Sequence, residues 1–285
     1  MNLNMTRRLL GSLVLAGAGM IAGVAVLRAQ PQADVPMRHS LMQFGVCGYG
    51  IINAPTASFT QLPGVDNCLG MVTKSSSFEG GSGGGYGVGA VVGLRPGSGG
   101  SFTSHLGGAV KLAFSSSNTK FEADEEIGQV SDAKGTIVPA ISRYTVEAKV
   151  TQVSLDPTIS YWIGPKLPLL FSVGAHLGYV LGGTYSQGEK LVSPQGLTYK
   201  TEGTTERNQN SGDLQQVSKI GGGILVGLGY DLQVTPKLSI RPEVEGLLSL
   251  SAPVSGIDWK SHELHLGVSF MFTPPSEGPS PLREE

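Results

Sequence analysis

The chain has 285 residues, of which 15% are charged and 42 are glycine, and its formal net charge is −2. Charged residues are well below the usual quarter and glycine is about twice its normal share, which argues against solvated helices and favours closely packed strands. The weak net charge and the lack of a basic cluster in the sequence exclude nucleic acid as an expected partner.

The first 29 residues have the composition of an export signal. Arg7 and Arg8 precede an uncharged apolar stretch over residues 9–27, and small or aliphatic residues lead up to Ala29. We therefore expect cleavage after Ala29, followed by an N-terminal linker over residues 30–39. The alternative is an uncleaved membrane anchor, since about 18 apolar residues can span a bilayer. The glycines of the stretch and the polar residues after it favour cleavage.

The sequence contains two cysteines, Cys47 and Cys68. Export would place them in a compartment where disulfides persist. A Cys47–Cys68 bridge is therefore a hypothesis, with two unpaired thiols as the alternative, because the Cα separation decides and the sequence does not give it.

After the signal, apolar and polar residues alternate with period two in segments of about ten residues, the pattern of a membrane β-barrel. Eight segments show it: 42–52, 86–94, 106–114, 153–163, 169–185, 220–234, 238–250 and 264–272. The first is the least regular, and we include it because bacterial single-chain barrels have an even number of strands. Apolar parity breaks near Thr151, which indicates a β-bulge or the edge of the membrane there.

The connections between these segments alternate in length. Residues 96–104, 164–168 and 235–237 form short links, 252–260 an intermediate one, and 53–85, 116–143 and 186–217 long ones. Short links are typical of the periplasmic side and long loops of the outside, so eight strands place both termini in the periplasm. The tail over 273–285 has four prolines and is expected to be disordered.

With these features the chain resembles the small outer-membrane barrels grouped as OmpA-like or PorT-like porin-family proteins. The resemblance covers residues 40–272 and includes the aromatic ending at 266–272 and the stretches 61–68 and 80–85, which look like a first outer loop and the entry to the second strand. It implies one all-β domain, an eight-stranded antiparallel up-and-down transmembrane barrel. Thirteen residues follow Phe272 and the sequence offers no peptidoglycan-binding domain, so the anchoring role of larger relatives is not implied.

Charged residues fall on the face that this barrel would turn inward. We interpret them as an internal ion-pair network, because an eight-stranded barrel is just wide enough for side chains to fill and buried charges need partners. A polar pore lining or a proton-handling cluster is the alternative. The predicted members are Arg95, Lys111, Lys219, Asp231, Arg241, Glu243 and Glu245.

Aromatic residues suggest two further roles. We expect Tyr161, Trp162, Phe270 and Phe272 to lie at the membrane interface. Aromatic residues of the long loops are expected to be available for contacts with host surfaces, phage or neighbouring proteins, since loops carry function in such scaffolds. These are Phe59, Phe78, Tyr144, Tyr199 and Trp259.

The sequence assigns no catalytic residue, metal or cofactor. His105, His176 and His265 are expected to point inward, but no serine has nucleophile-elbow spacing, so an outer-membrane lipid hydrolase stays an alternative. The acidic run 124–126 is expected in a solvated loop, and three adjacent carboxylates cannot converge on calcium alone. The glycines at 80–85 lack the Lys-Ser/Thr of a phosphate loop.

The expected function is that of a non-enzymatic, monomeric outer-membrane protein in contact with lipid, with a structural or surface-interaction role and unidentified extracellular or periplasmic protein partners. The alternative from another class is a soluble secreted barrel of the lipocalin type that binds a small apolar ligand, in which the two strand faces would be inverted. Glycines gather on the polar face, which favours a narrow packed lumen over a solvated surface.

Overall fold

The computed structural model describes residues 41–65, 77–96, 102–131, 135–164, 167–200 and 202–274. Its elements are β1 (Leu41–Asn53), β2 (Thr56–Phe59), β3 (Phe78–Arg95), a 3-10 helix η1 (Phe102–His105), β4 (Leu106–Ser131), β5 (Ile137–Gly164), β6 (Leu167–Ser193), β7 (Glu206–Asp213), β8 (Ile220–Tyr230), β9 (Leu232–Thr235), β10 (Leu238–Ser249), β11 (Asp258–Lys260) and β12 (Glu263–Phe272). The predicted signal, linker and nearly all of the tail lie outside the described residues. Within the described part, no helix is long and apolar enough to cross a membrane.

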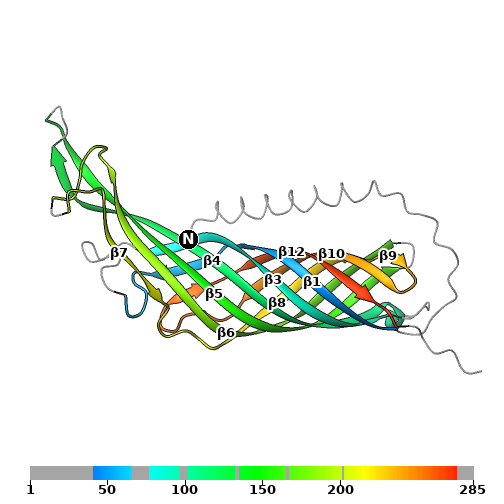
Figure 1. Ribbon diagram of the computed structural model, residues 1–285. Helices are drawn as coiled ribbons and strands as arrows, with labels where there is room; N and C mark the ends of the chain where they lie inside the picture. The colour runs from blue at the N-terminus through cyan, green and yellow to red at the C-terminus, as the bar shows by residue number, and fades with distance from the viewer. Residues whose placement is uncertain are drawn as a thin grey trace, which may run out of the picture. The chain divides into compact units, whose positions relative to one another are not determined.

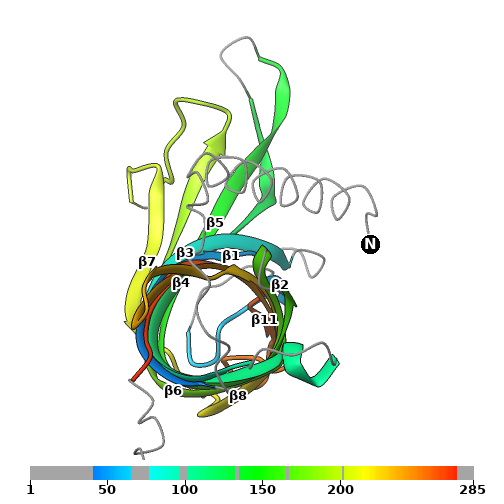
Figure 2. The same cartoon turned by 90° about the vertical axis from the view of Figure 1, so that its right-hand side faces the viewer.

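Eight of these strands form a closed antiparallel ring. Their order is β1-β12-β10-β8-β6-β5-β4-β3, and β3 returns to pair with β1 from Leu41↔Arg95 to Asn53↔Gly83. The view along the barrel shows the closed ring (Figure 2). The predicted fold class is therefore confirmed: every strand of the ring has a neighbour on both sides, as lipid requires.

A belt of apolar side chains covers the outside of the ring. Large aliphatic and aromatic residues from all around it are 41–55% exposed, among them Val88, Val92, Leu112, Leu155, Phe171, Val173, Leu177, Val226 and Phe270. A surface in water does not carry so much contiguous apolar area, whereas a surface in hydrocarbon requires it. The apolar face is thus outward, the opposite of the inverted arrangement that a soluble ligand-binding barrel needs.

Glycine on the inner face lets large side chains cross a narrow lumen. A Cβ on Gly87 of β3 would collide with the ring of Tyr49, which projects inward from β1. A Cβ on Gly83 would collide with the backbone carbonyl of Asn118 on β4. The gathering of glycine on the polar face is therefore a packing requirement.

Three strands extend much further than the sequence predicts. β4, β5 and β6 have 26, 28 and 27 residues, and they continue beyond the ring at the end opposite the short turns (Figure 1). The predicted loop over 116–143 is a strand hairpin, and much of that over 186–217 belongs to β6 and β7. We call the ends of the ring the short-turn end and the long-loop end. The continuation of β4 to β7, with residues 122–131, 137–150, 183–193 and 206–213, is called the projecting sheet.

The sequence predicts loops in these regions because the apolar and polar faces of the strands change places where the apolar belt ends. On β5 the outward residues change from Leu155 and Val153 to Lys149 and Glu147, while the inward residues change from Ser154 to Val150. The break in the apolar alternation near Thr151 therefore marks the point where the outside of β5 passes from lipid to water. A register shift in the β5–β6 pairing also lies there, between Thr151 and Gln152, and its extra residue is Leu181 of β6.

The apolar belt predicts that a charge placed on it destabilises the barrel. Val173→Arg on β6 should lower the free energy of unfolding by about 2–4 kcal/mol, because the guanidinium would enter hydrocarbon near mid-barrel. Ser186→Arg, on the exposed outward face of the same strand beyond the belt, should change it by less than about 0.5 kcal/mol. Urea unfolding in phospholipid vesicles measures both, and equal small effects would contradict a lipid-facing belt.

Candidate functional site

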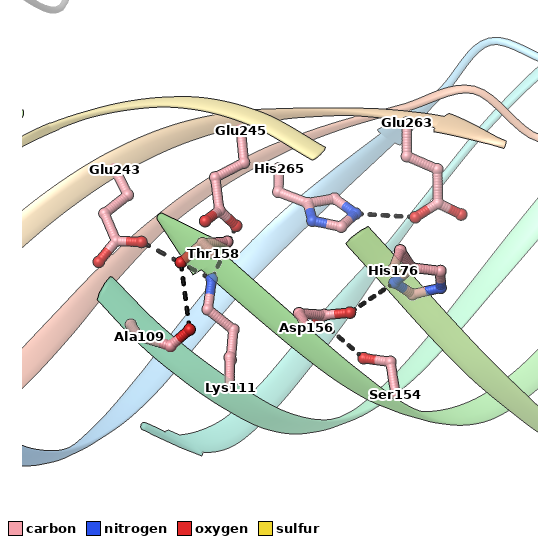
Figure 3. Close-up of polar contacts among 10 residues, drawn as sticks. All are labelled: Ala109, Lys111, Ser154, Asp156, Thr158, His176, Glu243, Glu245, Glu263 and His265. Atoms are coloured by element: carbon pink, nitrogen blue, oxygen red, sulfur yellow. Dashed lines mark hydrogen bonds and ion pairs between the residues drawn. The ribbon is translucent and has the colours of Figure 1, made fainter. Parts of the chain in front are cut away.

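The middle of the lumen is crossed by an ion-paired triad. Lys111 Nζ on β4 lies 2.7 Å from Glu245 Oε2 and 3.6 Å from Glu243 Oε2, both carboxylates on β10 (Figure 3). β4 and β10 stand on opposite sides of the ring of eight, so these contacts span the lumen. Tyr49 and His265 stack at 4.7 Å beside the triad, and the ammonium of Lys111 lies 5.7 Å from the Tyr49 ring.

A second polar group fills the short-turn end. Arg241 lies 3.3 Å from the buried carboxylate of Asp231 and 3.3 Å from the Gln43 side chain, and Arg95 lies 3.5 Å from Asp231. Trp162 completes the group, with the guanidinium carbons of Arg95 and Arg241 at 5.4 and 5.2 Å from its ring centre. The Asp231 carboxylate and the aromatic face of Trp162 together stabilise both guanidinium groups, of which that of Arg241 is buried and that of Arg95 is partly exposed.

The structure thus brings together six of the seven residues expected in the lumen, but in two groups. Lys219 is not among them: it is exposed at the entry to β8, above the belt. β8 begins at Ile220, so Lys219 precedes the strand and the alternation within β8 does not determine where its side chain points.

Trp162 also departs from the expected interface position. Its side chain is 7% exposed and lies inside, since Tyr161 and Ile163 on either side of it face outward. Tyr161, Phe270 and Phe272 are outward and 37–47% exposed, a position suited to the membrane interface.

Two histidine–carboxylate pairs lie in the lumen nearer the long-loop end. His176 Nδ1 on β6 is 2.7 Å from Asp156 Oδ1 on β5, and His265 Nε2 is 2.8 Å from Glu263 Oε2 on β12 (Figure 3). Sequence reasoning placed both histidines inward but counted neither Asp156 nor Glu263 among the lumen charges, although alternation along β5 and β12 turns both carboxylates inward. His105 was wrongly expected in the lumen: it ends η1 and stacks on the outward ring of Tyr161 at 5.6 Å.

The chemistry available to the His176 pair is limited by its neighbours. Ser154 Oγ donates to Asp156 at 3.0 Å, so the hydroxyl contacts the acid and not the base, unlike an activated serine. The adjacent cavity, lined by His176, Glu263 and Trp259 among others, has a volume of about 50 Å³. Such a space holds a few water molecules and not a lipid.

Aromatic side chains close the long-loop end. Phe121 of β4 lies 5.1 Å from Phe59 and 5.3 Å from Trp259 between ring centres, and Phe78 lies 5.1 Å from Phe59. β2 pairs with β11 and with β3, and these pairings hold the two short strands within the outline of the ring (Figure 2). The expectation that these loop aromatics are presented to partners is wrong, since Phe59, Phe78, Tyr144, Tyr199 and Trp259 are all at most 7% exposed.

Cys47 is buried on the inner wall, in a cluster with Val91 and Met271. Cys68 lies outside the described residues, so the Cys47–Cys68 bridge stays a prediction.

The projecting sheet is held together by one buried carboxylate. Glu189 of β6 accepts hydrogen bonds from Ser142 Oγ at 2.7 Å, Tyr199 OH at 3.1 Å and Asn208 Nδ2 at 2.6 Å. The Arg207 guanidinium of β7 donates two more, at 2.7 and 2.8 Å, and lies 4.0 Å from the Tyr199 ring centre. β5, β6, β7 and the segment before Lys200 are therefore tied at one point.

The charges of this cluster stabilise each other. Burial raises the pKa of Glu189, but the hydrogen bonds from Arg207, Ser142 and Tyr199 outweigh it, so the net pKa lies below its usual range. The hydrogen bonds that Arg207 donates to Glu189 raise the pKa of Arg207. Burial and the nearby Glu189 carboxylate raise the pKa of Tyr199, which keeps its hydroxyl protonated as a donor.

The acidic run does not lie in a loop. Asp124, Glu125 and Glu126 are consecutive residues of β4, so Asp124 and Glu126 face outward and Glu125 is buried on the other face. Asp124 is bound by Arg143 at 2.7 and 3.0 Å. Strand alternation separates the three carboxylates, so they do not converge on one point.

Known proteins resemble this chain only remotely. No protein-family model matches the chain, and no curated protein matches it. Among solved structures, Neisserial surface protein A is 12% identical, with 81% of this chain and 97% of that chain covered and a TM-score of 0.26. The outer-membrane protein OprG of Pseudomonas aeruginosa is 11% identical (82% and 95% covered, TM-score 0.31). The outer-membrane protease OmpT of Escherichia coli is also 11% identical (84% and 99% covered, TM-score 0.27).

Removal of the central cation should leave the carboxylates of Glu243 and Glu245 side by side inside the barrel without a cation between them and β4. Lys111→Met is expected to cost about 3–5 kcal/mol of unfolding free energy, because the buried charges lose their partner. The triple variant Lys111→Met, Glu243→Gln, Glu245→Gln should recover most of that loss, as removing the whole charge set removes the unpaired carboxylates. Urea unfolding in vesicles compares them, and a triple variant less stable than the single one would contradict a triad held by charge balance.

The lowered pKa of Glu189 predicts how the projecting sheet responds to acid. A carboxylate whose folded pKa is depressed stabilises the fold above its unfolded pKa, and this stability is lost as pH falls through the folded pKa. Limited proteolysis should therefore show protected β6 and β7 down to mildly acidic pH and cleavage at more acidic pH. Glu189→Gln should be cleaved at every pH, whereas Glu206→Gln, in the exposed Lys190 pair, should behave as wild type. Equal protection of both variants would refute the role of Glu189.

Proposed function

We propose that this protein is exported to the bacterial outer membrane, where its barrel is a closed support for a rigid sheet that contacts macromolecules outside the cell. In this proposal the short turns face the periplasm and the projecting sheet faces outward. The protein has no enzymatic role, and its lipid partners are those of the outer membrane. It belongs with small outer-membrane barrels of the OmpA-like or PorT-like kind.

The observation that carries the proposal is the projecting sheet itself. β4, β5 and β6 continue past the apolar belt and are joined there by β7, with the Glu189 cluster as a clamp. Tyr144, Val146 and Tyr185 pack in one core with the aromatic group that closes the long-loop end. Ordered strands of this length beyond the membrane are not needed to close a barrel. Their outward face carries charged pairs such as Asp124–Arg143 and Lys190–Glu206, which suits polar contacts with another macromolecule.

The filled lumen supports a role other than transport. The triad of Lys111 crosses the middle, the Arg241 group occupies one end and the Phe121 group the other. A solute would have to break buried ion pairs to pass, and each such break costs several kcal/mol.

A filled lumen predicts very low conductance. Purified wild-type protein in planar bilayers should give no stable channel openings at moderate voltage. Large, regular openings from protein that migrates as a folded barrel on unheated gels would contradict the closed lumen.

The surface role is tested by trimming the projecting sheet. Residues 124–143 are replaced by Asn-Gly, which joins the paired Ala123 and Tyr144 by a two-residue turn. Cells with the trimmed protein should lose retention on immobilised serum and matrix glycoproteins that the wild type shows, while a change of gel mobility on boiling checks the barrel. Equal retention by wild-type, trimmed and protein-free cells on the whole panel would refute the proposal.

A further inference from the structure

The wall of the barrel has a notch where β6 changes partner. β8 pairs with β6 up to Tyr179↔Ile220, and β7 pairs with it from Thr184↔Asp213. Lys219 O still accepts a hydrogen bond from Val180 N at 2.8 Å, and Leu214 N still donates one to Gly183 O at 2.9 Å. Between these two bonds the chain over 215–218 turns away toward Pro253 and Val254, which it contacts through a bridge at Val217 and a hydrogen bond from Ser218 N of 2.9 Å. The result is an open cavity of about 700 Å³, lined among others by Lys149, Thr151, Gly182, Thr184, Asp213 and Lys219.

The notch lies at the edge of the apolar belt that is nearer the long-loop end. Tyr179, Leu181 and Ile220 beside it are 51%, 50% and 74% exposed and are the last large apolar residues on their strands before the notch. Lys149 and Thr151 follow Val153 outward on β5, directly after the belt. A molecule seated here would therefore have its polar part in the notch and its apolar part along the belt.

The lysines of the notch differ from other basic residues of the same surface. Lys120 pairs with Glu122, Arg143 with Asp124, and Lys190 with Glu206. Within the described residues, neither Lys149 nor Lys219 has such an ion pair. Asp213 also lines the cavity, so its lining carries two positive charges and one negative charge, together with the hydroxyls of Thr151 and Thr184.

We propose that this notch binds the phosphate-bearing headgroup of an outer-leaflet lipid. Two ammonium groups and two hydroxyl donors match a phosphate, for which lysine acts as a point charge. The acyl chains would lie along Tyr179, Leu181 and Ile220. The inference rests on the membrane-spanning barrel and not on the recognition role of the projecting sheet, so either can fail without the other.

The test is native mass spectrometry of the full folded protein in neutral detergent, with phosphatidic acid, diacylglycerol of the same acyl chains, and inorganic phosphate as probes. Wild type should retain one phosphatidic acid, and neither diacylglycerol nor an equal concentration of inorganic phosphate should replace it. Lys149→Ala and Lys219→Ala should each weaken retention about fivefold, the factor that corresponds to about 1 kcal/mol per basic residue near a membrane surface.

Two further variants complete the design. Gly182→Trp should abolish retention by filling the notch, and it should fold, because a Cβ at Gly182 would meet no atom within 4 Å. Lys237→Ala, an exposed lysine at the short-turn end, should bind as wild type. Equal retention of diacylglycerol, equal binding of inorganic phosphate, or unchanged retention in both notch lysine variants would overturn the proposal.

Discussion

A strand that crosses hydrocarbon must find all its backbone hydrogen-bond partners within the protein, because lipid offers none. The return of β3 to β1 satisfies this constraint, and other features follow from it. A ring of only eight strands leaves a lumen that side chains fill. Glycine must then stand wherever a large residue such as Tyr49 crosses, and every charge that points inward needs a partner. The triad of Lys111, Glu243 and Glu245 is the consequence of that narrow space.

The same strands obey the opposite rule once they leave the lipid. On the long-loop side of Thr151 the outside of the sheet meets water, so apolar residues turn inward and charged residues outward. The projecting sheet is thus a soluble β-structure built on the continuation of membrane strands. Because no described strand pairs with its two edges, it needs a clamp, and the five hydrogen bonds accepted by Glu189 provide it. The proposed contacts outside the membrane depend on this clamp and on the polar outer face of the sheet.

Much of the barrel could be predicted from sequence because alternation reports burial directly wherever a strand has two different faces. It identified all eight ring strands and their outward residues. It missed β4 after Phe114 and β5 before Val153, because the apolar and polar faces change places there and the alternation then resembles that of a loop. The long-loop aromatics were misassigned for a related reason: Phe59 and Trp259 are far apart in sequence, and only the pairing of β2 with β11 brings them into one core.

The contacts between side chains in the lumen could be predicted only in part. Alternation gave the inward direction of Lys111 and Glu245, but not that β4 and β10 stand opposite each other, which decides that their charges meet. Trp162 could have been placed correctly, since its neighbours Tyr161 and Ile163 were already outward. The notch at Gly182 could not have been predicted from sequence, because it depends on where along β6 the pairing with β8 ends and the pairing with β7 begins.

The most direct test of this account is the position of the membrane edge on β5. In a variant with Cys47→Ala and Cys68→Ala, single spin labels at Leu155, Val153, Lys149 and Glu147 report collisions with oxygen, which is enriched in lipid, and with a water-soluble nickel complex. A membrane edge at Thr151 predicts oxygen collisions at Leu155 and Val153 and nickel collisions at Lys149 and Glu147. The same collision profile at all four positions would contradict it.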